Sequence, residues 1–143
     1  MSSVLFTEEN KVPGFGDDHR RTIYEINSPE DGFSIQGFFI KSNNLPLGIH
    51  YHERKSELFK IVEGRGFVLL YAVEKTGETI NPAKIRREEL VAGTVVYVPP
   101  MTAHTFYLDP GSRMMSFSTA PYDDNDKDMT RFPELEMKEE PRN

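Results

Sequence analysis

The sequence predicts an all-β domain built as a sandwich or barrel. Short β-prone runs recur along the chain, and clusters of Gly, Pro, Asn and Asp separate them. No stretch of any length shows the hydrophobic period of a helix. At 143 residues the chain is long enough for one hydrophobic core. Strands at this spacing, without helices, are typical of sandwiches and barrels.

The predicted strands follow one another along the chain, and a turn signal bounds each of them. Residues 27–32 form a dense turn signal after the first strand, and residues 43–46 turn the chain into a strand that carries His50. The glycines of residues 63–66 predict a tight hairpin, and residues 74–84 predict a long hairpin loop. The other strands are expected at residues 22–26, 33–40, 58–62, 67–73, 85–90, 94–98, 104–108 and 113–118.

The two ends of the chain lack this pattern. We expect an irregular N-terminal arm at residues 1–20, a barrel at residues 21–120 and an acidic C-terminal tail at residues 121–143. Residues 135–140 of the tail are expected either to form a short helix or to stay mobile. His19, within the polar arm, is expected to be exposed.

Composition excludes several kinds of function. The formal net charge of −6 argues against nucleic acid as a partner. The chain has no cysteine, which excludes disulfides, thiolate metal sites and Cys nucleophiles. The N-terminus has no basic region followed by an apolar run, and no apolar run is long enough to span a membrane. We therefore expect a cytoplasmic protein with no membrane partner.

Three of the four histidines belong to one pattern. His50 and His52 are one residue apart on a predicted strand, so their side chains share a face. Glu57 follows after a short polar run, and His104 comes after the Pro99–Pro100 pair. Three imidazoles and a carboxylate form a donor set that suits a divalent transition metal. The sequence predicts one such ion and leaves Fe, Mn, Zn and Ni open.

A structural explanation of the same residues is also open. His50 and His52 could be half-buried residues bonded to the backbone, and His104 could pack in the core. Glu57 argues against this alternative, because an unpaired carboxylate inside a barrel is strongly disfavoured.

These residues carry a family resemblance. Residues 48–64 match G-x-H-x-H-x4-E-x6-G, which resembles the first motif of the cupin superfamily. Residues 93–104 resemble its second motif, G-x5-P-x-G-x2-H. The resemblance covers about residues 46–119 and implies a cupin-type double-stranded β-helix, or jelly-roll, barrel. It implies as metal ligands His50, His52, Glu57 and His104.

The chain departs from the cupin motifs at two positions. Met101 replaces the glycine of the second motif, so the turn before His104 is expected to be built differently, with help from the rigid Pro99–Pro100 pair. Leu108 stands where an asparagine is common. Neither change removes a ligand.

Two further stretches resemble cupins that act on sugars. Residues 48–52, followed by residues 122–132, are similar to cupins that act on sugar nucleotides or sugar phosphates. Residues 93–100 are similar to cupin-type phosphoglucose isomerases. The resemblance implies an isomerase or epimerase that works through a metal-stabilised enediolate. The candidates for proton abstraction are Glu57 and a metal-bound hydroxide. The alternatives are an iron-dependent dioxygenase and a non-enzymatic small-molecule-binding barrel.

Side-chain alternation predicts the walls of the pocket. The residues that share a face with Glu57 or His104 are apolar, whereas Lys60 and Tyr51 have the opposite parity and should point away from the site. The predicted wall residues are Phe59, Ile61, Phe106 and Leu108.

The expected partners are a small-molecule substrate, of carbohydrate type, and a second copy of the chain. A phosphorylated sugar would require basic side chains at the pocket mouth, and the candidates are Lys55, Arg54 and Arg86. The apolar stretch of residues 38–40 predicts a surface that is buried in a homodimer.

Overall fold

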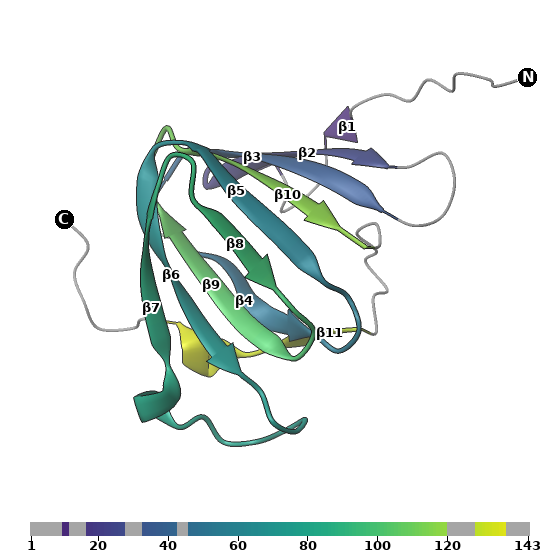
Figure 1. Ribbon diagram of the computed structural model, residues 1–143. Helices are drawn as coiled ribbons and strands as arrows, with labels where there is room; N and C mark the ends of the chain where they lie inside the picture. The colour runs from purple at the N-terminus through teal and green to yellow at the C-terminus, as the bar shows by residue number, and fades with distance from the viewer. Residues whose placement is uncertain (1–9, 12–16, 28–32, 43–45, 120–127, 137–143) are drawn as a thin grey trace, which may run out of the picture.

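The computed structural model of the protein describes residues 10–11, 17–27, 33–42, 46–119 and 128–136. These residues form two antiparallel sheets that pack face to face (Figure 1). The six-stranded sheet has the order β1-β2-β3-β10-β5-β8, and the five-stranded sheet has the order β11-β4-β9-β6-β7. The strands are β1 (Asn10–Lys11), β2 (Arg21–Asn27), β3 (Ser34–Ile40), β4 (Leu47–His52), β5 (Glu57–Glu63), β6 (Arg65–Ala72), β7 (Arg86–Val91), β8 (Val95–Val98), β9 (Thr102–Leu108), β10 (Arg113–Ser118) and β11 (Met129–Arg131).

The predicted all-β class is confirmed. The described residues contain no α-helix, only the short 3-10 helices η2 (Pro82–Lys84) and η3 (Pro133–Leu135). None of the helices in this part of the chain is long and apolar enough to cross a membrane. His19 is exposed, as expected.

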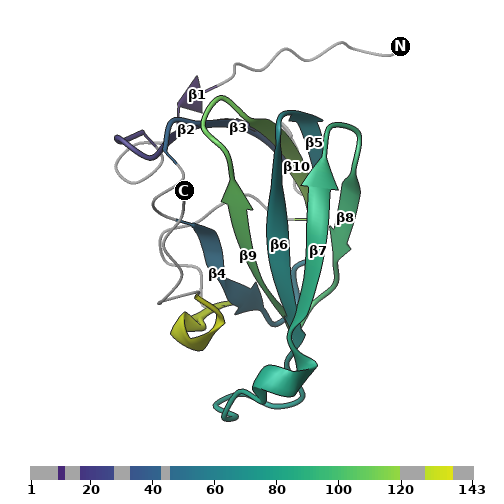
Figure 2. The same cartoon turned by 90° about the vertical axis from the view of Figure 1, so that its left-hand side faces the viewer.

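From β3 to β11 the chain changes sheet at every connection except the one between β6 and β7. Those two strands pair with each other, and the predicted long loop joins them; they lie side by side in Figure 2. The hairpin predicted at residues 63–66 is wrong, because β5 pairs with β8 and β10, whereas β6 pairs with β7 and β9. Gly64, with φ of 94°, turns the chain from one sheet to the other, and a Cβ there would overlap Ser112.

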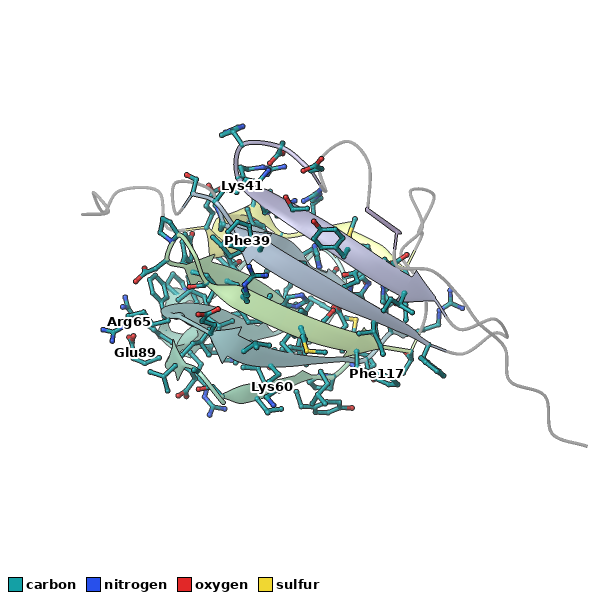
Figure 3. The ribbon with its side chains drawn as sticks, turned by 90° about the horizontal axis from the view of Figure 1, so that it is seen from above. Phe39, Lys41, Lys60, Arg65, Glu89 and Phe117 are labelled. Carbon is teal, nitrogen blue, oxygen red and sulfur yellow. The ribbon has the colours of Figure 1, made fainter. Side chains whose placement is uncertain are left out.

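The main hydrophobic core fills the space between the sheets. Burial alternates along β5, where Phe59 and Ile61 are buried and Lys60 is exposed. This alternation confirms the predicted inner and outer faces, and Figure 3 shows Lys60 at the outside of the molecule. The buried members of the core are Ile40, Leu47, Phe59, Ile61, Val68, Leu90, Val98, Phe106, Leu108 and Met114.

A second apolar cluster covers the outer face of the five-stranded sheet. Tyr51 of β4 is 1% exposed because the C-terminal segment packs over it, with the Phe132 ring 5.8 Å away and Leu135 in the same cluster. The amide of Phe132 donates a hydrogen bond of 2.8 Å to the carbonyl of Ile49. Tyr51 therefore points away from the histidines, as predicted, and is buried beneath the C-terminal segment.

Both predicted irregular ends contain short ordered elements. Asn10–Lys11 pairs with β2, and β11 pairs with β4. Of residues 135–140, considered as a short helix, Leu135 is helical, as the last residue of η3. Residues 137–140 lie outside the described part of the chain. The division at residues 20 and 120 stays a prediction.

The stretch predicted as a dimer surface is mostly internal. Ile40 is in the core, Phe38 lines a cavity, and the half-buried Phe39 ring lies 4.7 Å from the Arg113 guanidinium. Large apolar side chains instead lie exposed farther along the same sheet, such as Phe117 of β10 (Figure 3). The homodimer itself stays a prediction.

Candidate metal centre

A bulge in β4 determines which of its side chains face the interior. Gly48 pairs with Thr105 and His50 pairs with His104, so Ile49 is an extra residue on β4. Gly48 and Ile49 have φ values of 97° and 61°. A positive φ is rare for a β-branched residue and stores strain. This strained pair directly precedes the first candidate ligand.

After the bulge, two imidazoles point into the space between the sheets. The rings of His50 and His52 are 5.0 Å apart between centroids, which confirms the prediction that they share a face. A turn leads from His52 to Glu57, the first residue of β5, whose side chain is buried on the inner face of the opposite sheet.

β9 brings His104 to the same place, because β9 lies beside β4 (Figure 2). Met101, just before β9, has φ of 61°. Its amide donates to the carbonyl of His52 at 2.7 Å, and its carbonyl accepts from Val73 at 2.8 Å. Met101 itself thus adopts the left-handed conformation that favours glycine. The expected difference of this turn from the motif stays a prediction.

The side chains converge on one point. Donor atoms of His50, His52 and Glu57 all lie within 4.8 Å of one another, which makes these residues a possible metal site. Oε1 of Glu57 is 3.2 Å from Nε2 of His52 and 3.5 Å from Nε2 of His104. The rings of His50 and His104 are 4.7 Å apart. All four residues singled out from the sequence are therefore neighbours.

A backbone contact orients His104. Its Nδ1 lies 3.1 Å from the carbonyl oxygen of Thr102, which can only accept a hydrogen bond. This contact assigns the proton of the neutral imidazole to Nδ1. Nε2 then presents a lone pair toward Glu57.

Burial determines the protonation states at the site. It lowers the pKa of His50 and of His104 below 6.5, and it outweighs Glu57, which acts in the opposite direction on both. Burial alone would raise the pKa of Glu57, but the hydrogen bond from His52 and the neighbouring imidazoles lower it to about 2. Near neutral pH the site thus holds neutral His50 and His104 beside an ionised carboxylate, the states that metal binding requires.

These shifts predict acid sensitivity of the metal-free protein. As pH falls through about 6.5, the unfolded chain protonates His50 and His104, whereas the folded chain does so only at lower pH. The unfolded state then binds more protons, so the free energy of unfolding decreases toward acid. We expect a lower urea midpoint at pH 5.5 than at pH 7.5. His19→Ala, at an exposed position outside the cavity lining, is measured beside the wild type as a control for the loss of an imidazole. Equal wild-type midpoints would contradict the prediction.

Asp128 holds the turn that links β4 to β5. Its carboxylate accepts the amides of Arg54 at 2.7 Å and Lys55 at 2.9 Å, and its carbonyl accepts the amide of Glu53 at 2.9 Å. Oδ2 is also 3.8 Å from Nδ1 of His52, near enough to interact electrostatically but too far for a hydrogen bond. The sequence around Asp128 gives no sign of this role, because the segment resembles an acidic solvated tail.

Asp128→Ala should loosen this turn and misplace the ligands at its two ends. We expect a loss of about 2 kcal/mol in the free energy of unfolding, because two backbone amides lose a charged acceptor. Metal affinity should fall by about 10- to 100-fold, as for other residues that support ligands. Urea denaturation and metal titration measure the two effects. Glu134→Ala, an exposed change in the same C-terminal segment, is the control, and wild-type metal affinity in Asp128→Ala would contradict the role.

A cavity of about 240 Å³ adjoins the histidines. Its lining includes Phe59 and Phe106, as predicted. The prediction is wrong for Ile61 and Leu108, which are not among the lining residues and pack in the hydrophobic core. Of the basic residues proposed for the mouth, Lys55 lines the cavity, whereas Arg54 and Arg86 are not among the lining residues. Three arginines that the sequence analysis did not propose also line it, namely Arg20, Arg21 and Arg131.

Comparison with protein families identifies the fold. A family model described as Cupin matches residues 32–133, more than half of the chain. Comparison with curated proteins found no match.

Solved structures with the same fold include three kinds of protein. The capsular polysaccharide assembling protein CapF from Staphylococcus aureus has a TM-score of 0.63 and 21% identity; the match covers 87% of this chain but 34% of CapF. The nucleoside dehydratase Pac13 from Streptomyces, seen with uridine, has a TM-score of 0.62 and 15% identity, covering 92% and 93% of the two chains. A 3,4-ketoisomerase from Helicobacter canadensis has a TM-score of 0.55 and 12% identity, covering 71% and 70%.

These likenesses establish a shared fold. The chain spans about a third of the length of CapF and nearly the full length of Pac13. The predicted jelly-roll architecture is confirmed by the family match and these neighbours.

Proposed function

Because the chain belongs to the cupin family, we propose that it is a metal-dependent enzyme that isomerises or epimerises a sugar phosphate or sugar nucleotide. The proposed cofactor is one divalent transition-metal ion, Fe, Mn, Zn or Ni. The observation that carries the proposal is the convergence of three imidazoles and a carboxylate beside an apolar cavity. The proposed ligands are His50, His52, Glu57 and His104.

The distances within the site fit an ion. Two ligands bound about 2.1 Å from one ion, at tetrahedral or adjacent octahedral positions, lie about 3.0–3.4 Å apart. Oε1 of Glu57 is 3.2 Å and 3.5 Å from the Nε2 atoms of His52 and His104. Small side-chain rotations would therefore complete the site.

The electrostatics favour a cation at the same point. A lone pair on Nε2 of His104 that faces the ionised Glu57 is repelled by it, unless a positive charge lies between them. Burial keeps His104 from supplying that charge as a proton near neutral pH. A metal ion satisfies the nitrogen lone pair and the buried oxygen together.

A divalent ion bound here would supply Lewis acidity that stabilises the negative charge of an enediolate. The residues of the chain perform the remaining tasks. Phe59 and Phe106 pack against each other and against the His104 ring, where they would exclude water from the site. Glu57 is the proposed acid–base residue, but a pKa of about 2 makes it a weak base near neutral pH, so its role as a ligand carries more of the proposal.

The structural neighbours support a sugar-like or nucleoside-like substrate by analogy of fold only. One is a ketoisomerase, and another is a nucleoside dehydratase seen with uridine. The cavity volume of about 240 Å³ is slightly below the range typical of drug-sized ligands, which favours a small substrate such as a sugar phosphate.

An iron-dependent dioxygenase is the second candidate. The aromatic and apolar cavity beside the histidines would suit a small organic substrate, and the same donors suit ferrous iron. A non-enzymatic small-molecule-binding barrel is the third candidate.

One experiment separates the three candidates. The metal-loaded protein is incubated with sugar phosphates and sugar nucleotides in D2O and followed by NMR. Proton transfer through an enediolate places solvent deuterium on a sugar carbon, and we expect this incorporation to disappear in His52→Ala. Oxygen consumption without deuterium incorporation would favour the dioxygenase instead. Tight retention of a ligand without turnover would favour the binding barrel.

A further inference from the structure

The cavity beside the metal centre is cationic, although the chain as a whole is acidic. Its lining includes four basic side chains, Arg20, Arg21, Lys55 and Arg131, and among the described lining residues Glu57 is the one acidic side chain. The formal net charge of the chain is −6. The positive charge is therefore concentrated locally, and a divalent ion at the histidines would add to it.

Arg21 is the most buried of these basic residues. Its side chain lies on the inner face of β2, opposite Ile40 of β3, and the residue is 7% exposed. Burial, with the positive charges of Arg20 and Arg131, lowers the pKa of Arg21 to about 10, and Asp18 opposes the shift. Arg21 therefore keeps its positive charge near neutral pH, within the lining of the cavity.

Arg131 approaches from the other sheet. It lies on β11, directly opposite His50 in the register of β4, and its Nη1 is 3.5 Å from the carbonyl of Gly48. Arg131, Arg21 and His50 all line the same cavity. Two guanidiniums from opposite sheets thus face one cavity.

Three other charged residues lie near these two arginines. Arg20 forms an ion pair of 2.8 Å with Asp18. Glu25, farther along the inner face of β2, accepts a hydrogen bond of 2.6 Å from Gln36 and does not line the cavity. Lys55 also lines the cavity, and its positive charge contributes to lowering the pKa of His104.

We infer that Arg21 and Arg131 form an anion site that binds a phosphoryl group of the substrate, while the sugar part reaches the metal centre. The identity of this substrate rests on the proposed function. Guanidinium groups bind phosphoryl oxygens in bidentate fashion, and a dianion neutralises two of them at once. Lys55, which lines the same cavity, would also contact the substrate.

The test uses inorganic phosphate as the probe and the full-length chain, both metal-loaded and after treatment with a chelator. We expect phosphate to bind in both states by calorimetry, because the arginines rather than the ion hold it. Arg131→Gln should weaken phosphate binding at least tenfold with unchanged metal content. Arg21→Gln should weaken phosphate binding as well, but a change at this buried position can also impair folding. Arg131→Gln, at an exposed position, is therefore the decisive variant. Arg86→Gln, on β7 and outside the cavity lining, is the matched control.

The results separate this inference from the proposed function. Phosphate binding that depends on Arg131, without turnover of any sugar phosphate, would support the anion site and count against the proposed enzyme. Binding that disappears with the metal, or that Arg131→Gln and Arg86→Gln weaken equally, would overturn the anion site. Deuterium incorporation would still test the enzyme in that case.

Discussion

Glu57→Gln should lower metal affinity by at least about 100-fold, while the protein stays folded. Glutamine has nearly the same shape as glutamate, but it carries no charge and presents an amide that binds transition metals poorly. The loss exceeds what is typical of supporting residues, because Glu57 supplies the single negative charge of the proposed ligand set. Competition titration against a chromogenic chelator measures the affinity, and circular dichroism checks the fold.

Glu63→Gln is the control for that change. It removes a carboxylate from the same strand, β5, but at an exposed position outside the cavity lining. His104→Gln extends the test, since a site of His50, His52 and Glu57 alone would tolerate this change. If all four residues bind the ion, His104→Gln should also lower metal affinity strongly. Wild-type affinity in Glu57→Gln would contradict any metal role for this carboxylate.

Gly48→Ala is expected to destabilise the protein and disturb the metal centre together. Gly48 has φ of 97°, and a Cβ there would lie 2.6 Å from the carbonyl oxygen of His104. The left-handed conformation and the backbone clash together should decrease the free energy of unfolding by about 3 kcal/mol. Relief of the clash would move β9 away from β4, and His104 with it. We therefore expect weaker metal binding, measured in parallel with urea denaturation.

Gly37→Ala provides the matched comparison. Gly37 lies in β3, and a Cβ there would meet nothing within 4 Å. This change should alter stability by less than about 1 kcal/mol and leave metal affinity intact. Equal stability of the two alanine variants would contradict the close packing of β4 on β9.

The candidate ligands could be recognised from the sequence because local rules determine their positions. Alternation along a strand is enough to place His50 and His52 on one face. The same rule separates Glu57 from Lys60 on β5. Alternation alone could not place His104 at the site, because only the pairing of β9 with β4 brings it near the other ligands. The resemblance to the second cupin motif supplied that information.

Features that depend on strand partners were harder to predict. The glycines near Gly64 indicate a turn, but nothing local indicates that β5 and β6 belong to different sheets. The bulge at Ile49 is equally hidden, because a β-branched residue does not favour a positive φ. Because the bulge adds one residue to β4, the side chains after Ile49 point to the opposite faces from those expected by continuing the alternation before it.

The remaining omissions concern residues that act across long sequence distances. Asp128 contacts the turn after β4 from more than seventy positions away. Arg21 and Arg131 meet at one cavity from opposite ends of the described chain. Their sequence neighbourhoods are polar and charged, so each resembles a solvated surface until the sheets are assembled.

The central claim is that His50, His52, Glu57 and His104 hold one transition-metal ion. Crystals of the protein loaded with that ion, measured at its absorption edge, test the claim most directly. The account predicts a single anomalous peak about 2.0–2.3 Å from one donor atom of each of the four side chains. A fully loaded crystal without a peak at this position, or with its ion bound elsewhere, would contradict the claim.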